Sequence, residues 1–138
     1  MRKSLGKEQV EELTVRWKRA LADYQNLEKR YEREKADFVA FAGSNLILKL
    51  LVVLDHLKMA QAVISDPGLD IAIKEFGQVL NEEGLIEVEA LDKKFDPSLM
   101  EAVDLVKGEK DKVIEVLQTG YSLKGKLLRA ARVRVGKG

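Results

Sequence analysis

Residues 7–42 read KEQVEELTVRWKRALADYQNLEKRYEREKADFVAFA, a segment that contains no glycine and no proline. Its apolar residues recur three and four positions apart, the spacing that places side chains on one face of an α-helix in a heptad repeat. The stripe consists of Val10, Leu13, Trp17, Ala20, Tyr24, Leu27, Tyr31, Phe38 and Phe41. Only Glu34 interrupts it. The pattern predicts one long helix from about Leu5 to Ala42.

This helix is too long to be covered by the rest of the chain. At 1.5 Å per residue it measures about 57 Å, whereas a compact chain of this size has a radius of gyration of about 14 Å. We therefore expect the stripe to pair with a second copy in a homodimer, although a groove on a partner helix is an alternative use. The expected dimer contacts in this helix are Trp17, Tyr24, Leu27, Tyr31 and Phe38.

Two shorter helices are predicted next. Gly43-Ser44-Asn45 interrupts the first helix, and an apolar segment follows from Leu46 to Ile64. Asp66-Pro67-Gly68 has turn chemistry, and Leu69 to Glu83 is amphipathic, with Gly84 suited to its C-terminal cap. Two helices from each of two chains would complete a four-helix bundle. The expected bundle contacts between chains are Leu50, Leu54 and Leu57.

The period changes from 3.6 to 2 after Gly84. Alternating apolar residues occur from Ile86 to Ala90, from Ile114 to Val116 and from Ala131 to Val135, which predicts strands. At Phe95–Ala102 we expect a turn followed by a short helical piece. The predicted class is α+β, with a long paired helix in residues 1–44, the bundle helices in 45–84 and a small, mostly antiparallel β module in 85–138.

Composition excludes several classes of protein. The chain has 138 residues, a formal net charge of +1 and no cysteine, so disulfides, zinc fingers and thiol nucleophiles are excluded. The apolar stretch from Leu46 to Leu54 contains Lys49 and is too short to span a bilayer. Met1–Leu5 is basic and leads into charged residues, which is not the pattern of a signal peptide. We expect a cytoplasmic protein that does not use a membrane.

No group of residues assembles an active site. His56 is the only histidine and has no nucleophile or metal-ligand set around it in the sequence, so we expect neither catalysis nor a metal site. Residues 120–126 lack the spacing of a phosphate-binding loop. We therefore expect a protein that is not an enzyme and that holds no cofactor.

The last 21 residues, from Gln118 onward, carry six cations and no acid. The cations are Lys124, Lys126, Arg129, Arg132, Arg134 and Lys137. They form either a solvated face balanced by acids of earlier strands or a docking surface for an acidic groove on a partner protein. Nucleic acid is a weaker alternative, because no aromatic residues interleave with these charges.

Four segments resemble the GrpE family of nucleotide exchange factors for DnaK-type chaperones. They are ADYQNLEKR at 22–30, LLVVLDHL at 50–57, FDPSLMEA at 95–102, and VLQTGYSL at 116–123 followed by LLRAARVRV at 127–135. The resemblance covers about Leu21 to Gly138. It implies a homodimer whose β module opens the nucleotide-binding domain of the chaperone, so that ADP leaves.

The resemblance also implies the positions that face the chaperone or support that contact. They are Phe41, Gly68, Pro97, Leu117, Lys126, Arg129 and Val135, with Arg129 serving in docking or in the fold. Two other functions remain open from the residues alone. One is a coiled-coil adaptor or tether whose β module binds another protein, and the other is a nucleic-acid-binding dimer.

Overall fold

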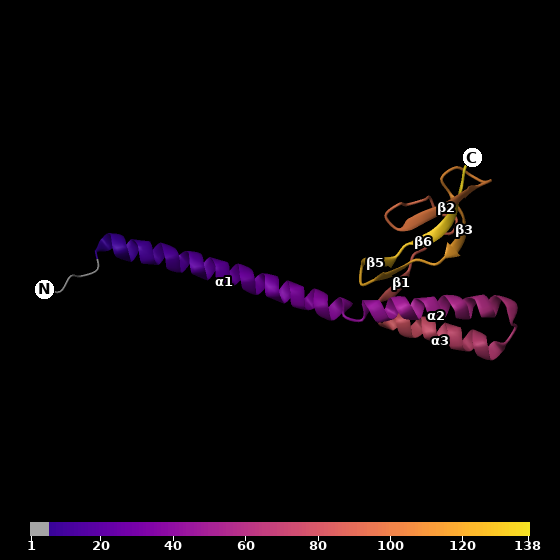
Figure 1. Ribbon diagram of the computed structural model, residues 1–138, viewed down its shortest axis with the longest axis horizontal. Helices are drawn as coiled ribbons and strands as arrows, with labels where there is room; N and C mark the ends of the chain where they lie inside the picture. The colour runs from indigo at the N-terminus through magenta and orange to yellow at the C-terminus, as the bar shows by residue number, and fades with distance from the viewer. Residues whose placement is uncertain (1–5) are drawn as a thin grey trace. The chain divides into compact units, whose positions relative to one another are not determined.

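A computed structural model describes residues 6–138, and the basic segment Met1–Leu5, with our expectation of no signal peptide there, lies outside the described residues. The chain forms two compact units, one ending at Phe41 and the other running from Ala42 to Gly138. Helix α1 (Lys7–Phe41) makes up the first unit. Figure 1 shows the elements in chain order. The predicted α+β class is confirmed.

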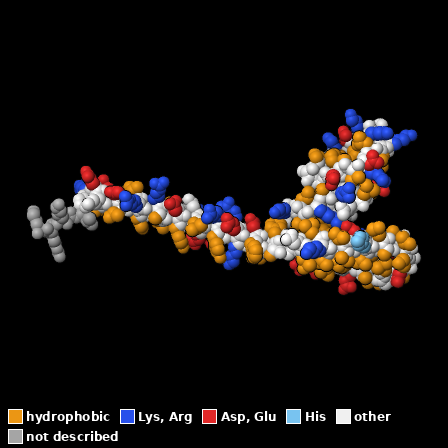
Figure 2. Space-filling view, in the orientation of Figure 1, with side chains coloured by type: hydrophobic (Ala, Val, Ile, Leu, Met, Phe, Trp, Pro, Cys, Tyr) orange, Lys and Arg blue, Asp and Glu red, His pale blue; other side chains and the backbone are white. Residues whose placement is uncertain are grey.

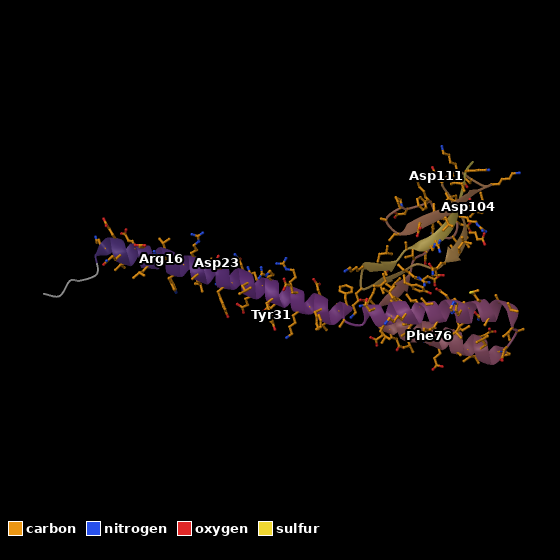
Figure 3. All side chains as sticks on the ribbon, viewed as in Figure 1. Arg16, Asp23, Tyr31, Phe76, Asp104 and Asp111 are labelled. Atoms are coloured by element: carbon orange, nitrogen blue, oxygen red, sulfur yellow. The ribbon has the colours of Figure 1, made fainter. Side chains whose placement is uncertain are left out.

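Helix α1 buries none of its side chains in the single chain. Trp17, Tyr24 and Tyr31 are each 62% exposed, and Tyr31 projects outward from the helix (Figure 3). Two ion pairs between residues four apart lie on its surface: Arg16 Nη2 lies 2.7 Å from Glu12, and Arg30 Nε lies 3.8 Å from Glu34. Such exposed pairs each stabilise the helix by only a few tenths of a kcal/mol. They therefore do not make up for the apolar stripe, which stays exposed to solvent in the single chain.

The second unit begins with a helical hairpin. Helix α2 (Ser44–Val63) and helix α3 (Pro67–Glu82) lie side by side (Figure 1). Leu51 and Leu54 of α2 and Ile73 and Leu80 of α3 are buried. Many other apolar side chains of the hairpin stay exposed, as Figure 2 shows in orange. The hairpin therefore has an inner core and an uncovered outer apolar face.

By length and composition alone, the helical stretch Lys7–Val63 includes a segment of 18 residues that is apolar enough to cross a membrane. Little of that segment is buried within the chain. The same property belongs to core helices of soluble proteins.

Within residues 6–138, six strands form two three-stranded sheets, with orders β1-β4-β5 and β2-β6-β3. Their bounds are β1 (Leu85–Glu87), β2 (Met100–Val106), β3 (Val113–Gln118), β4 (Tyr121–Leu123), β5 (Lys126–Arg129) and β6 (Ala131–Gly136). The β2–β6 pair is parallel, and the other pairs are antiparallel, so the module is mostly antiparallel, as predicted. Its core consists of Ala90, Met100, Val113, Ala131, Val133 and Val135.

The expectation for Phe95–Ala102 was partly wrong. The helical piece is a single turn, in which the N–H groups of Leu99 and Met100 both donate to the Asp96 carbonyl. A seven-residue strand, β2, then begins at Met100. Strand β2 was not predicted, because a bulge between Ala102 and Asp104 breaks its alternation and its side chains are mostly exposed.

The start of α3 gives a testable prediction. The Asp66 carboxylate accepts a hydrogen bond of 2.8 Å from the Gly68 N–H, and Pro67 occupies the first helical turn. Asp66→Ala removes this N-cap and is expected to lower the free energy of unfolding by about 1 kcal/mol. Urea unfolding measures the change, and Ser65→Ala in the same exposed loop is the control. Equal unfolding curves for the two variants would show that the cap contributes nothing.

Candidate functional site

The β module and its junction with α2 hold most of the positions that the sequence singled out. Pro97 lies in the turn before β2, Leu117 on β3, Lys126 and Arg129 on β5, and Val135 on β6. Pro97, Leu117 and Lys126 are exposed, whereas Val135 is only 3% exposed in the module core. The first three side chains are in contact with solvent, and Val135 packs in the module core.

The remaining positions lie on helices. Gly68 is exposed in the first turn of α3, and Phe41 ends α1 with a half-buried side chain. Among the expected dimer residues, the five on α1 are exposed, and Leu50 and Leu57 are half-buried. Leu54 is 2% exposed, so its side chain has almost no surface left to bury against a second chain, and it lines a pocket with Ile73 and Leu80 of the hairpin and Leu85 and Tyr121 of the β module.

The turn that holds Pro97 is fixed by Asp96. One oxygen of its carboxylate accepts from the Ser98 N–H at 2.9 Å and from the Ser98 hydroxyl at 2.6 Å. These hydrogen bonds favour the charged carboxylate and lower the pKa of Asp96. The exposed Pro97 is thus presented on an ordered turn.

Among the C-terminal cations, Arg134 and Arg129 pair with acids of the same chain. Arg134 on β6 contacts Glu115 on β3 at 2.7 Å, and Arg129 contacts Asp55 on α2 at 2.6 Å. Arg132 is exposed and lines a groove between α2 and β3 together with His56, Met59 and Leu117. The basic surface is therefore less strongly charged than the sequence alone indicates.

The contact between Arg129 and Asp55 is bidentate. The Nη1 and Nη2 atoms of Arg129 donate to the two carboxylate oxygens at 2.6 and 2.8 Å, and Nε donates to the Thr119 carbonyl at 2.8 Å. The guanidinium carbon lies 5.3 Å from the centroid of the Tyr121 ring, within range of a cation–π contact. The two side chains are only 13% and 24% exposed. Planar two-point pairing of this kind fixes orientation as well as charge.

Comparison with known proteins identifies the family. Residues 3–137 match the family model described as GrpE. The chain belongs to the GrpE family. Relatives named "Protein GrpE" include those of Brachyspira hyodysenteriae, 34% identical over 131 residues (86% of this chain and 66% of that protein), and Methanosphaera stadtmanae, 34% identical over 136 residues (94% and 79%). The relative from Campylobacter concisus is 35% identical over 138 residues, covering 90% of this chain and 75% of that protein.

Sequence reasoning on this GrpE-family chain missed Asp55. It is the only acid between Leu46 and Ile64, and acids are rarely placed in apolar helices unless they have a partner. The position of this single acid in an apolar helix therefore indicated that Asp55 has a partner. It did not indicate that the partner is Arg129, which is 74 residues away in the chain.

The same GrpE-family chain offers no evident metal site in its described part. Within residues 6–138, no group of three or more His, Cys, Asp or Glu side chains is placed to hold a metal ion. His56 is exposed on α2, facing the groove that Arg132 lines.

Acid should weaken the Arg129–Asp55 pair. Burial raises the pKa of Asp55, but the hydrogen bonds and charge of Arg129, together with Gln118 and Lys58, outweigh it and hold the pKa below its ordinary value of 3.8. A lowered folded-state pKa means that the stabilisation is complete above pH 3.8 and is lost as the pH falls through the folded-state value. We expect Asp55→Asn to lower the free energy of unfolding by about 2 kcal/mol at pH 7.

Urea unfolding of the parent chain and Asp55→Asn at pH 7, 5 and 3 checks this prediction. The difference between the two proteins is expected to be equal at pH 7 and 5 and smaller at pH 3. A difference that stays constant down to pH 3 would contradict it.

Proposed function

We propose that this protein is a homodimeric co-chaperone that accelerates ADP release from a DnaK-type chaperone. The family match over residues 3–137 carries the proposal. The fold supports it, because an uncovered helical stripe, an uncovered hairpin face and a small β module with exposed motif positions occur in one chain. The family resemblance also favours the cytoplasm as its compartment.

The exposed apolar surfaces of α1 and of the α2–α3 hairpin are best explained by contact with a second copy of the chain. The five expected contact residues of α1 expose between 52 and 74% of their surface, which is unusual for large apolar side chains in a contiguous stripe. On the hairpin, Leu50, Phe76 and Val79 line a shallow apolar hollow, and Phe76 is marked in Figure 3. Pairing two hairpins would bury this hollow in a four-helix bundle.

A bilayer is a poorer cover for α2. Its middle carries Asp55, His56 and Lys58, and Asp55 is bound to Arg129 of the β module. Placing this helix across a membrane would bring these charged groups into the apolar interior or break the pair, and either change is strongly unfavourable. We therefore propose that a second chain covers the apolar segment within Lys7–Val63.

The proposed docking surface lies on the β module. Pro97, Leu117 and Lys126 offer an ordered turn, an apolar side chain and a cation, all exposed. We assign Val135 to support of this surface, and Phe41 and Gly68 to helix-side contact or its support.

The mechanism is differential binding. An exchange factor that binds the open, nucleotide-free chaperone more tightly than the closed, ADP-bound form must lower the affinity for ADP by the same factor. No bond is made or broken by the factor, so this mechanism needs no catalytic residue.

Affinity for the chaperone's nucleotide-binding domain, measured with and without ADP, tests the proposal. Binding is expected to be roughly tenfold or more tighter without ADP. Leu117→Glu is expected to weaken it, whereas Leu105→Glu, the same change at an exposed leucine on β2, is the matched control. Equal affinity with and without ADP would instead favour an adaptor or tether.

A further inference from the structure

Arg129 joins three parts of the second unit at one point. Its guanidinium holds Asp55 of α2, the Thr119 carbonyl that follows β3, and the face of Tyr121 on β4. Two further hydrogen bonds reinforce the junction: Gln118 Nε2 donates to Asp55 at 3.4 Å, and Lys58 Nζ donates to the Tyr121 hydroxyl at 3.3 Å. We call Asp55, Lys58, Gln118, Tyr121 and Arg129 the clamp.

We propose that Arg129 is a positioning residue, which fixes the angle between the β module and the α2–α3 hairpin and thereby sets exchange activity without touching the chaperone. This inference rests on the function proposed above for the partner and the reaction. Its structural part, the fixed angle, stands on the clamp alone.

The contacts of Arg129 argue against a direct docking role. Its side chain is 13% exposed, and the Nε, Nη1 and Nη2 atoms all donate within the chain. Asp55 neutralises its charge at 2.6 Å. A docking arginine would need to leave these partners, and a partly buried carboxylate left unpaired is unfavourable.

The clamp is one attachment between the hairpin and the module. Another is the covalent passage from α3 to β1 at Gly84, where φ is +95°. There Asn81 donates to the Leu85 carbonyl and Lys124 donates to the Gly84 carbonyl. In addition, Leu54, Ile73 and Leu80 of the hairpin line a pocket together with Leu85 and Tyr121 of the module. Apolar contact is non-directional and leaves some freedom to pivot about the junction, whereas the bidentate attachment on α2 fixes orientation and removes that freedom.

A fixed angle matters for a protein that opens a cleft. If the module pivots, only a fraction of its orientations fit the open chaperone, and the apparent affinity falls by that fraction. Loss of the clamp should therefore weaken binding and exchange together while the module itself remains folded.

A double-mutant cycle tests the assignment. Arg129→Lys keeps the charge but loses the fork, and Asp55→Asn keeps the shape but loses the charge. Each variant is expected to reduce the acceleration of labelled ADP release roughly tenfold, and the double variant no more than either one, because both remove one interaction. If Arg129 docked directly, Asp55→Asn would leave exchange at the parent level, and that result would overturn the proposal.

A distance measurement tests the angle without any chaperone. The chain has no cysteine, so spin labels can be placed through Lys74→Cys on α3 and Lys110→Cys in the β module, both exposed. The labelled chain is diluted with unlabelled chain so that distances within one chain dominate. We expect a narrow distribution in the parent and a broad one in Arg129→Lys and Asp55→Asn.

Arg134→Lys is the matched control for the distances, since it makes the same change in the Arg134–Glu115 pair, which lies wholly within the β module. An unchanged distribution in both clamp variants would overturn the fixed angle. If Arg129→Lys does not fold, the nearly isosteric Asp55→Asn carries the test. If the parent protein does not accelerate ADP release from the chaperone, the proposed function is refuted. The distance distributions would still show whether the clamp fixes the orientation of the β module.

Discussion

Replacing Tyr24 and Tyr31 by glutamate is expected to separate the two chains. Both side chains are 62% exposed in the single chain, and burying an aromatic side chain contributes about 2 kcal/mol. Two chains lose four such contacts and bring four acids together along one seam. We expect the dissociation constant to rise at least about a thousandfold, which corresponds to about 4 kcal/mol.

Sedimentation equilibrium measures this dissociation constant, and circular dichroism follows the helix. Because α1 buries no side chain on its own, it should lose helix content when separated, as isolated helices are marginal in water. Gln25→Glu with Asn26→Glu adds the same two charges per chain outside the stripe and is the control. A Tyr24/Tyr31 variant that remains as dimeric as this control would refute pairing through α1.

Gly136→Ala is expected to destabilise the β module strongly. Gly136 is buried at the end of β6, and an added Cβ would meet the Glu109 carbonyl oxygen and lie 2.7 Å from the Glu109 carbonyl carbon. These are backbone atoms, and they are held in place because the Gly136 N–H donates to Lys112 and its carbonyl accepts from Asp111. We expect a loss of about 3 kcal/mol in the free energy of unfolding.

Urea unfolding of Gly136→Ala, followed in the β module, gives that value. Gly77→Ala is the matched control, because Gly77 is exposed inside α3 and an added Cβ meets nothing within 4 Å. Alanine there should be neutral or stabilise by up to about 1 kcal/mol. Equal stability of the two variants would show that the close approach at Gly136 is readily relaxed.

The elements that sequence predicted are those with strong local periodicity. The stripe from Val10 to Phe41 marked α1, and Gly84 marked the end of α3 with its positive φ. Alternation marked β3 and β6, whose Val113, Val133 and Val135 form the module core. In α3 and β6 the apolar pattern and the buried face coincide. The stripe of α1 is exposed in the single chain, and β3 buries Val113, which the alternation of Ile114 and Val116 did not include. The period was therefore sufficient to locate these elements, but it gave the buried face only in α3 and β6.

What sequence missed depends on contacts between distant segments. Strand β2 pairs in parallel with β6 across a bulge near Asp104, so its pattern is irregular. Arg129 had an expected role in docking or the fold, but its partner Asp55 is 74 residues away. Leu54 belongs to the predicted apolar helix, yet only the fold shows that it is buried within its own chain. The spacing of apolar residues along the chain does not indicate which distant residues pair with one another.

We propose that this protein makes a DnaK-type chaperone release ADP faster. Stopped-flow release of fluorescently labelled ADP from the cognate chaperone, over a range of concentrations of this protein, measures that rate directly. We expect a release rate that rises with concentration and saturates at roughly tenfold or more above the spontaneous rate. An unchanged release rate at micromolar concentrations, with the dimer shown to be intact, would contradict it.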